Sequence, residues 1–195
     1  MHMKKHDIIR AAETQFAREV TIGVIYQQPP SAWYYLIPGM FIIDFLRRTT
    51  AISRYTKHFM FPRNLALDAA RDISSGEEKA LVDRNLDDDI KQWLQSLNLY
   101  STELARAQRA AVDVLADHYT RLLQAQGATY YELIAKAYPA RSAFENHLRA
   151  LTDAENEIDR AIIARAGTNE NLKEKLHLEA LQVAQRRNKT VEDVY

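Results

Sequence analysis

The chain contains no cysteine, and it has only five glycines and five prolines among its 195 residues. Without cysteine there can be no disulfide bond, thiolate metal site or cysteine nucleophile, which is compatible with a reducing compartment. Because glycine and proline are scarce, a β-rich or loop-rich fold is disfavoured and long helices are favoured. We therefore expect a cytoplasmic, all-α protein built as a helical bundle.

Sequence motifs of nucleotide-binding and hydrolytic enzymes are also missing, since the chain has no P-loop, GxGxxG, GxSxG or HExxH. A di-metal centre in a helical bundle needs more than one Glu-x-x-His pair, and we find this spacing at Glu174 and His177 alone. His118 lies on an apolar helix stripe, where we expect a core histidine rather than a ligand. We assign no catalytic residue, cofactor or metal, and we expect that the protein is not an enzyme.

Acidic residues recur in two DxxxD motifs, Asp83–Asp87 and Asp113–Asp117. On one continuous helix the motifs would lie about 45 Å apart and could not converge on a metal ion. A further acidic cluster over residues 153–159 is expected to face solvent, beside Arg149 and Arg160. We interpret all three groups as helix starts or solvated faces.

Charge is absent from residues 20–43, although 27% of the whole chain is charged. A membrane-spanning helix needs about 20 continuous apolar residues, and the polar, proline-containing stretch 27–31 interrupts this run. Two interpretations stay open. The segment lies in a membrane interface as an apolar hairpin, or it is buried against protein.

A basic segment follows the uncharged run. Residues 1–65 carry nine Lys and Arg against four acids, although the whole chain has 26 of each sign. The apolar and basic positions of 41–61 alternate as in an amphipathic helix of about five turns, which suits an anionic membrane or a protein partner. Nucleic acid is not expected, because the net charge is zero. The predicted contact residues are Trp33, Tyr34, Tyr35, Phe41, Phe45, Arg47, Arg48, Ile52, Arg54 and Lys57.

Apolar residues recur at helical spacing along the chain, and breaking residues separate the stretches. We expect Pro62 to begin a new helix and Gly76 to end it. The capping box Thr129–Glu132 predicts another helix start, with a kink before Pro139. The expected helices cover 7–26, 32–37, 41–61, 62–74, a stretch from Glu77 or Asp87 to Gln126, 130–166, and a last helix capped by Thr168 or Asn169.

The longest pattern has an apolar residue every three or four positions from Leu86 to His118, as in a coiled coil. It predicts one unbroken helix, then a short turn at residues 127–129 and an antiparallel partner helix. Gln108 and Arg109 lie off this heptad seam, so polar changes there are expected to be nearly silent.

Together these features predict a non-catalytic, peripheral membrane-associated helical scaffold or adaptor. It would consist of an N-terminal region (1–76) and a long helical hairpin with a closing helix (77–195). We expect it to dock through residues 20–63, at the inner face of the membrane, and to form a homo-oligomer through its heptad seam. One alternative is a soluble helical-bundle oligomer whose apolar segment is an intersubunit core. Another is a helical-bundle enzyme or small-ligand binder.

Overall fold

The computed structural model describes the backbone of residues 4–26, 40–166 and 170–195, and the side chains in these ranges except those of 40–48, 166 and 171. The described residues form helices and no strand, which confirms the all-α prediction. The helices are α1 (Lys5–Tyr26), α2 (Met40–Ser74), α3 (Lys79–Ser96), α4 (Thr102–Gln124), α5 (Tyr130–Ala137), α6 (Arg141–Ala166) and α7 (Glu170–Val194).

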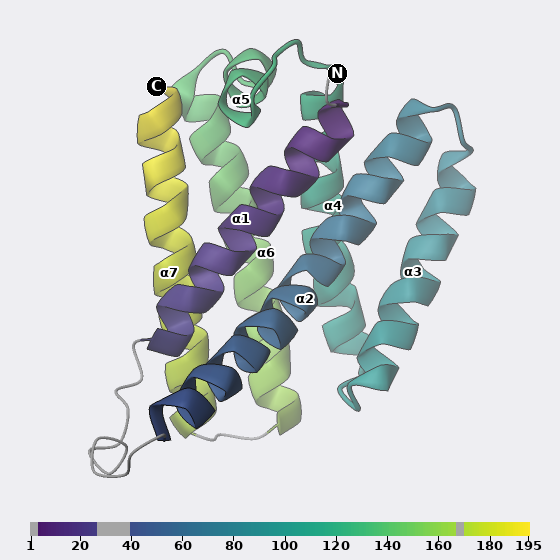
Figure 1. The fold of residues 1–195 in the computed structure, drawn as a ribbon. Helices are drawn as coiled ribbons and strands as arrows, with labels where there is room; N and C mark the ends of the chain where they lie inside the picture. Colours follow the sequence, from purple (N-terminus) through teal and green to yellow (C-terminus); the bar gives the residue numbers. More distant parts are fainter. Residues whose placement is uncertain (1–3, 27–39, 167–169) are drawn as a thin grey trace.

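The long helices form a bundle in which α1 and α2 run diagonally across one face (Figure 1). Behind this pair lie α4, α6 and α7, while α3 packs on the outer side against α2 and α4. The short helix α5 covers the end of the bundle at which both termini lie (Figure 1). The opposite ends of α1 and α2, which flank the uncharged segment of the sequence, lie together at the other end of the bundle.

The apolar core is centred on α4, which touches α1, α2, α3, α5 and α6. Leu104, Leu115 and Leu122 of α4 are buried at intervals that bring them to one side of the helix. The same core includes Ile9 from α1 and Leu67 from α2. Both of the regions expected from the sequence, 1–76 and 77–195, therefore contribute side chains to one core.

The prediction of a single helix from Leu86 to beyond His118 is wrong, because the chain turns back between α3 and α4. Asn98 takes a positive φ of 57°, and the N–H of Leu99 donates to the carbonyl of Leu94, which closes the end of α3. Ser101 then caps α4 by accepting a hydrogen bond from the backbone N–H of Leu104. Two successive helices that face one core carry the same three-and-four spacing as one long helix, so spacing alone could not separate them.

The prediction that Pro62 begins a helix is also wrong, since α2 continues through it from Met40 to Ser74. Proline removes one backbone hydrogen bond and crowds the preceding turn. The guanidinium of Arg63 donates to the Phe59 carbonyl in that turn, at 3.3 Å. Packing along α1 and α4 holds the helix together across this defect. Gly76 follows the helix with a φ of 94°, as expected of its end.

The predicted capping box is confirmed at α5, where Thr129 Oγ1 accepts from the N–H of Glu132 and the Glu132 carboxylate accepts from the N–H of Ala128. The chain does not merely kink before Pro139, because α5 ends at Ala137 and α6 begins at Arg141. The expected helix at 32–37 and the caps at 168 and 169 fall outside the described residues. Within the described ranges, no helix is both long and apolar enough to cross a membrane.

Candidate functional site: a buried charge network between two cavities

Seven of the ten predicted contact residues belong to the first half of α2. Trp33, Tyr34 and Tyr35 are outside the described residues, and so are the side chains of four others in this set, Phe41, Phe45, Arg47 and Arg48. Ile52 is half-buried, whereas Arg54 and Lys57 are exposed. Neither of these two cations forms an ion pair with a described residue, so their charges are available to an outside partner.

The apolar face of α2 around residues 55–59 is turned toward the protein. Phe59 packs against Phe16, with ring centroids 6.1 Å apart, and against an apolar cluster that α1 and α7 share. Tyr55 donates a hydrogen bond to the carboxylate of Glu179 on α7, and Thr56 donates to Thr21 on α1. This part of the helix therefore presents its cations, rather than its apolar side chains, to the outside.

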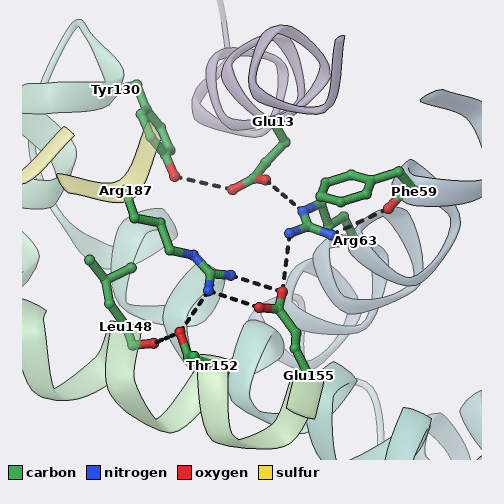
Figure 2. A network of polar contacts seen from close by, with 8 residues as sticks. All are labelled: Glu13, Phe59, Arg63, Tyr130, Leu148, Thr152, Glu155 and Arg187. Carbon is green, nitrogen blue, oxygen red and sulfur yellow. Dashed lines mark hydrogen bonds and ion pairs between the residues drawn. The ribbon is translucent and has the colours of Figure 1, made fainter. Parts of the chain in front are cut away.

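The acidic cluster at 153–159 does not all face solvent, because Glu155 points into the bundle. Its two carboxylate oxygens each accept a hydrogen bond of 2.8 Å from Arg187 of α7 (Figure 2). A second guanidinium, that of Arg63, lies 3.5 Å from the same carboxylate. Arg63 also donates to Glu13 of α1 at 3.2 Å. The four residues Glu13, Arg63, Glu155 and Arg187 thus join α1, α2, α6 and α7 in one charge network.

Burial makes the pairing within this network necessary. Arg63 and Arg187 are only 6% and 7% exposed, and a buried unpaired charge is strongly destabilising. Two guanidinium groups face two carboxylates, so the charges of the four residues balance. Tyr130 donates to Glu13 at 3.1 Å, and the guanidinium of Arg63 lies 3.9 Å from the centroid of the Phe59 ring. The network is held by these additional contacts and carries no surplus charge.

Two cavities lie on either side of this network, and Arg63 and Arg187 line both of them. The first, which we call the histidine cavity, has a volume of ≈ 390 Å³ and contains His118 and His147. The second, which we call the carboxyl cavity, has a volume of ≈ 450 Å³ and contains Asp159 and Glu179 in its walls. Both volumes are in the range of ligand pockets, about 300–1,000 Å³.

The histidine cavity is built around two stacked imidazole rings. The ring centroids of His118 and His147 are 4.4 Å apart, and Nδ1 of His118 lies 2.9 Å from the hydroxyl of Tyr138. Burial, together with the positive charges of Arg187 and Arg121, lowers the pKa of His147 to about 4. Burial likewise holds the pKa of His118 well below its usual range. Both imidazoles are therefore neutral at pH 7, and His118 is the core histidine that its position predicted.

The carboxyl cavity is mainly apolar but contains carboxyl groups with altered acidity. Burial raises the pKa of Glu179 to about 7. Burial and the negative charge of Glu155 raise the pKa of Asp159 to about 6. Gln108 also lines this cavity and is only 5% exposed. This burial argues against the expectation that polar changes at Gln108 are nearly silent.

The DxxxD motifs were expected to stay apart, and this is wrong because α3 folds back along α4. Asp83, Asp87 and Asp113 converge on Arg109, with nitrogen–oxygen distances of 2.7, 2.7 and 3.0 Å. The three carboxylates pair with one guanidinium, so Arg109 links α3 to α4. This link argues against the expectation that polar changes at Arg109 are nearly silent. Among the residues that the structure describes, no group of three or more histidine and acidic side chains is placed to hold a metal ion.

The network residues were missed in the sequence although a signal for them exists. Three of the four stand on an apolar stripe at helical spacing: Glu13 between Ile9 and Val20, Arg63 between Met60 and Leu67, and Arg187 between Val183 and Val191. A charged residue on such a stripe predicts a buried partner.

Comparisons with protein-family models, with curated proteins and with solved structures gave no match for this chain.

Proposed function

We propose that the protein is a non-catalytic helical adaptor that docks on an anionic membrane surface through residues 20–63. The observation that carries this proposal is the pair of exposed cations, Arg54 and Lys57, on a helix that continues directly from the uncharged segment. Cations near an anionic lipid surface contribute about 1 kcal/mol each to binding. The succession of an apolar segment and exposed positive charge along the sequence supports attachment rather than chemistry.

The continuity of α2 supports the same proposal. Its second half is fixed in the core by buried residues such as Leu67 and Ala70, while Arg54 and Lys57 lie on its first half. Because one end of α2 is anchored in the core, its other end keeps a fixed orientation relative to the bundle. Docking of residues 20–63 would therefore orient the whole bundle on the surface. We place the protein, on this proposal, at the cytoplasmic face of a membrane.

Self-association is the second part of the predicted function and stays a prediction. The heptad residues Leu86, Ile90 and Leu104 are buried inside one chain, so an oligomer would have to use other surfaces or a rearranged bundle. Analytical ultracentrifugation over a range of protein concentrations measures whether the chain associates.

The docking proposal is tested by flotation of the full chain with lipid vesicles. We expect the protein to float with vesicles of phosphatidylcholine and phosphatidylglycerol, but not with phosphatidylcholine alone, and to be released by salt. Replacing Arg54 and Lys57 by Gln removes about 2 kcal/mol of attraction, which weakens binding about 30-fold.

The matched control is Arg84→Gln with Lys91→Gln on α3. Both residues are exposed and form no ion pair with a described residue, so the control changes the net charge by the same amount at a different surface. Equal weakening in the two double variants would show a general charge effect and would refute docking through α2. Failure of the wild-type chain to float with anionic vesicles would refute the membrane proposal altogether.

A further inference from the structure

The carboxyl cavity has the shape and the walls of a small-molecule site. It lies between α2, α4, α6 and α7, and its volume is ≈ 450 Å³. Apolar side chains make up most of its wall, including Ala111, Leu115, Leu151 and Val183. An apolar cavity with a few polar groups is the usual design of a site for a small organic ligand.

Two polar groups in the wall lack a partner. The side chain of Gln108 is 5% exposed and makes no hydrogen bond with any described residue. The indole Nε1 of Trp93 is buried and also has no hydrogen-bond partner in the described part of the chain. A buried polar group without a partner costs about 1–3 kcal/mol. The indole N–H of Trp93 and the amide of Gln108 are therefore available to hydrogen-bond a ligand in the cavity.

The charges around the cavity select the sign of that ligand. The wall contains the cations Arg63 and Arg187, but Glu13 and Glu155 already neutralise them. Neither Asp159 nor Glu179 forms an ion pair with a described residue, and the Glu179 carboxylate accepts a hydrogen bond from the neutral hydroxyl of Tyr55. His58 also lines the wall, but it is exposed. The unmatched charge of the cavity is therefore negative, which disfavours a fatty acid or another anion.

We propose that the carboxyl cavity binds a hydrophobic amine, whose ammonium group pairs with the half-buried carboxylate of Glu179 in a wall that Asp159 makes more negative. The alkyl or aromatic body of the amine fills the space between the apolar side chains of α4, α6 and α7. The amide oxygen of Gln108 is available to accept a further N–H of the ligand. This binding function is independent of the proposed docking through α2.

The acidity of the Glu179 carboxyl group supplies a signature of such binding. Because the pKa of Glu179 is about 7, its carboxyl group largely carries a proton at pH 6. An arriving ammonium ion favours the carboxylate, so the carboxyl proton is released to solvent as the ion pair forms. Binding of an amine at pH 6 therefore releases up to one proton, whereas binding of a neutral molecule releases none.

The test compares octylamine, octanol and octanoate, which share one alkyl chain and differ in head group. Trp93 reports occupancy by its fluorescence, and Trp33→Phe leaves it as the one tryptophan of the chain, which has two. We expect octylamine to bind about tenfold or more tightly than octanol, because a hydrogen bond to a charged group is stronger than one to a neutral group. Octanoate should bind weakest of the three. Calorimetry in buffers of different ionisation enthalpy measures the released proton.

Glu179→Gln should reduce octylamine binding to the level of octanol, and Asp159→Asn should reduce it by a smaller factor, while octanol binding is retained in both variants. Retained octanol binding shows that these variants fold. Glu157→Gln is the control, because Glu157 lies on α6 as Asp159 does, and its side chain is 58% exposed. Equal affinity for the three probes, preference for octanoate, or absence of any response of Trp93 would overturn the proposal. The α2 variants at Arg54 and Lys57 should bind octylamine normally, so failure of docking and failure of this site are distinguishable.

Discussion

Removal of Glu155 is the most direct perturbation of the buried network. In Glu155→Ala, Arg187 loses both of its 2.8 Å contacts with a carboxylate and keeps the hydroxyl of Thr152 as a hydrogen-bond acceptor. Arg63 still has Glu13 at 3.2 Å. The variant therefore leaves one guanidinium, that of Arg187, buried without a countercharge.

The expected loss follows from the burial of the two partners. Breaking a buried ion pair from one side costs about 3–5 kcal/mol. Glu155 is 29% exposed, so solvent screens part of the interaction, and we expect a loss near the lower limit, about 3 kcal/mol. For a chain of this size, each kcal/mol corresponds to a shift of about 2–4 °C in Tm. The melting temperature of Glu155→Ala should therefore fall by about 6–12 °C.

Urea and thermal unfolding followed by circular dichroism at 222 nm measure this loss. Glu157→Ala is the matched control, because Glu157 lies two residues away and forms an exposed pair with Arg160. Its removal should cost less than about 1 kcal/mol. The double variant Glu155→Leu with Arg187→Met removes both charges of the pair and should recover at least half of the loss.

Two results would refute this reasoning. If Glu155→Ala lost no more stability than Glu157→Ala, the carboxylate of Glu155 would not be neutralising a buried charge. If the double variant were less stable than Glu155→Ala, the packing of the two side chains, and not their charge, would determine the effect.

Two further changes test Glu179 and Pro62. Burial raises the pKa of Glu179 in the folded protein to about 7 from an ordinary value of 4.5. Between these pH values the folded state binds a proton that the unfolded state has lost. The free energy of unfolding therefore falls by about 3 kcal/mol as the pH rises through this range. Glu179→Gln should remove this decline in urea unfolding at pH 5–8, and a decline identical to that of the wild type would exclude Glu179 as its source. Pro62→Ala should raise the free energy of unfolding by about 1–3 kcal/mol, because proline is unfavourable inside a helix. A loss of stability in urea would instead indicate that Pro62 contributes more through packing than it costs in hydrogen bonding.

The polar stripe positions show how much of the site the sequence could have provided. Gln108 falls between Leu104 and Leu115 at helical spacing, as Glu13, Arg63 and Arg187 do on their own stripes. Such positions predict that a polar side chain is buried. They do not identify the partner, because Arg63 and Glu155 are 92 residues apart in the chain. The acidic segment 153–159 illustrates the same limit, since Glu157 is exposed and Glu155 is paired inside the bundle.

The sequence by itself determined the helical class, the capping box at Thr129, and the end of α2 at Gly76. These are local properties, set by periodicity, side-chain caps and backbone freedom within a few residues. Only the tertiary structure decided that the chain turns at Asn98, between α3 and α4, and that α2 continues through Pro62. Packing against neighbouring helices outweighs local preference at such positions, and neighbours distant in the chain are not encoded in local spacing. For the same reason, folding alone brought Glu13, Arg63, Glu155 and Arg187 together and formed a cavity on each side of them.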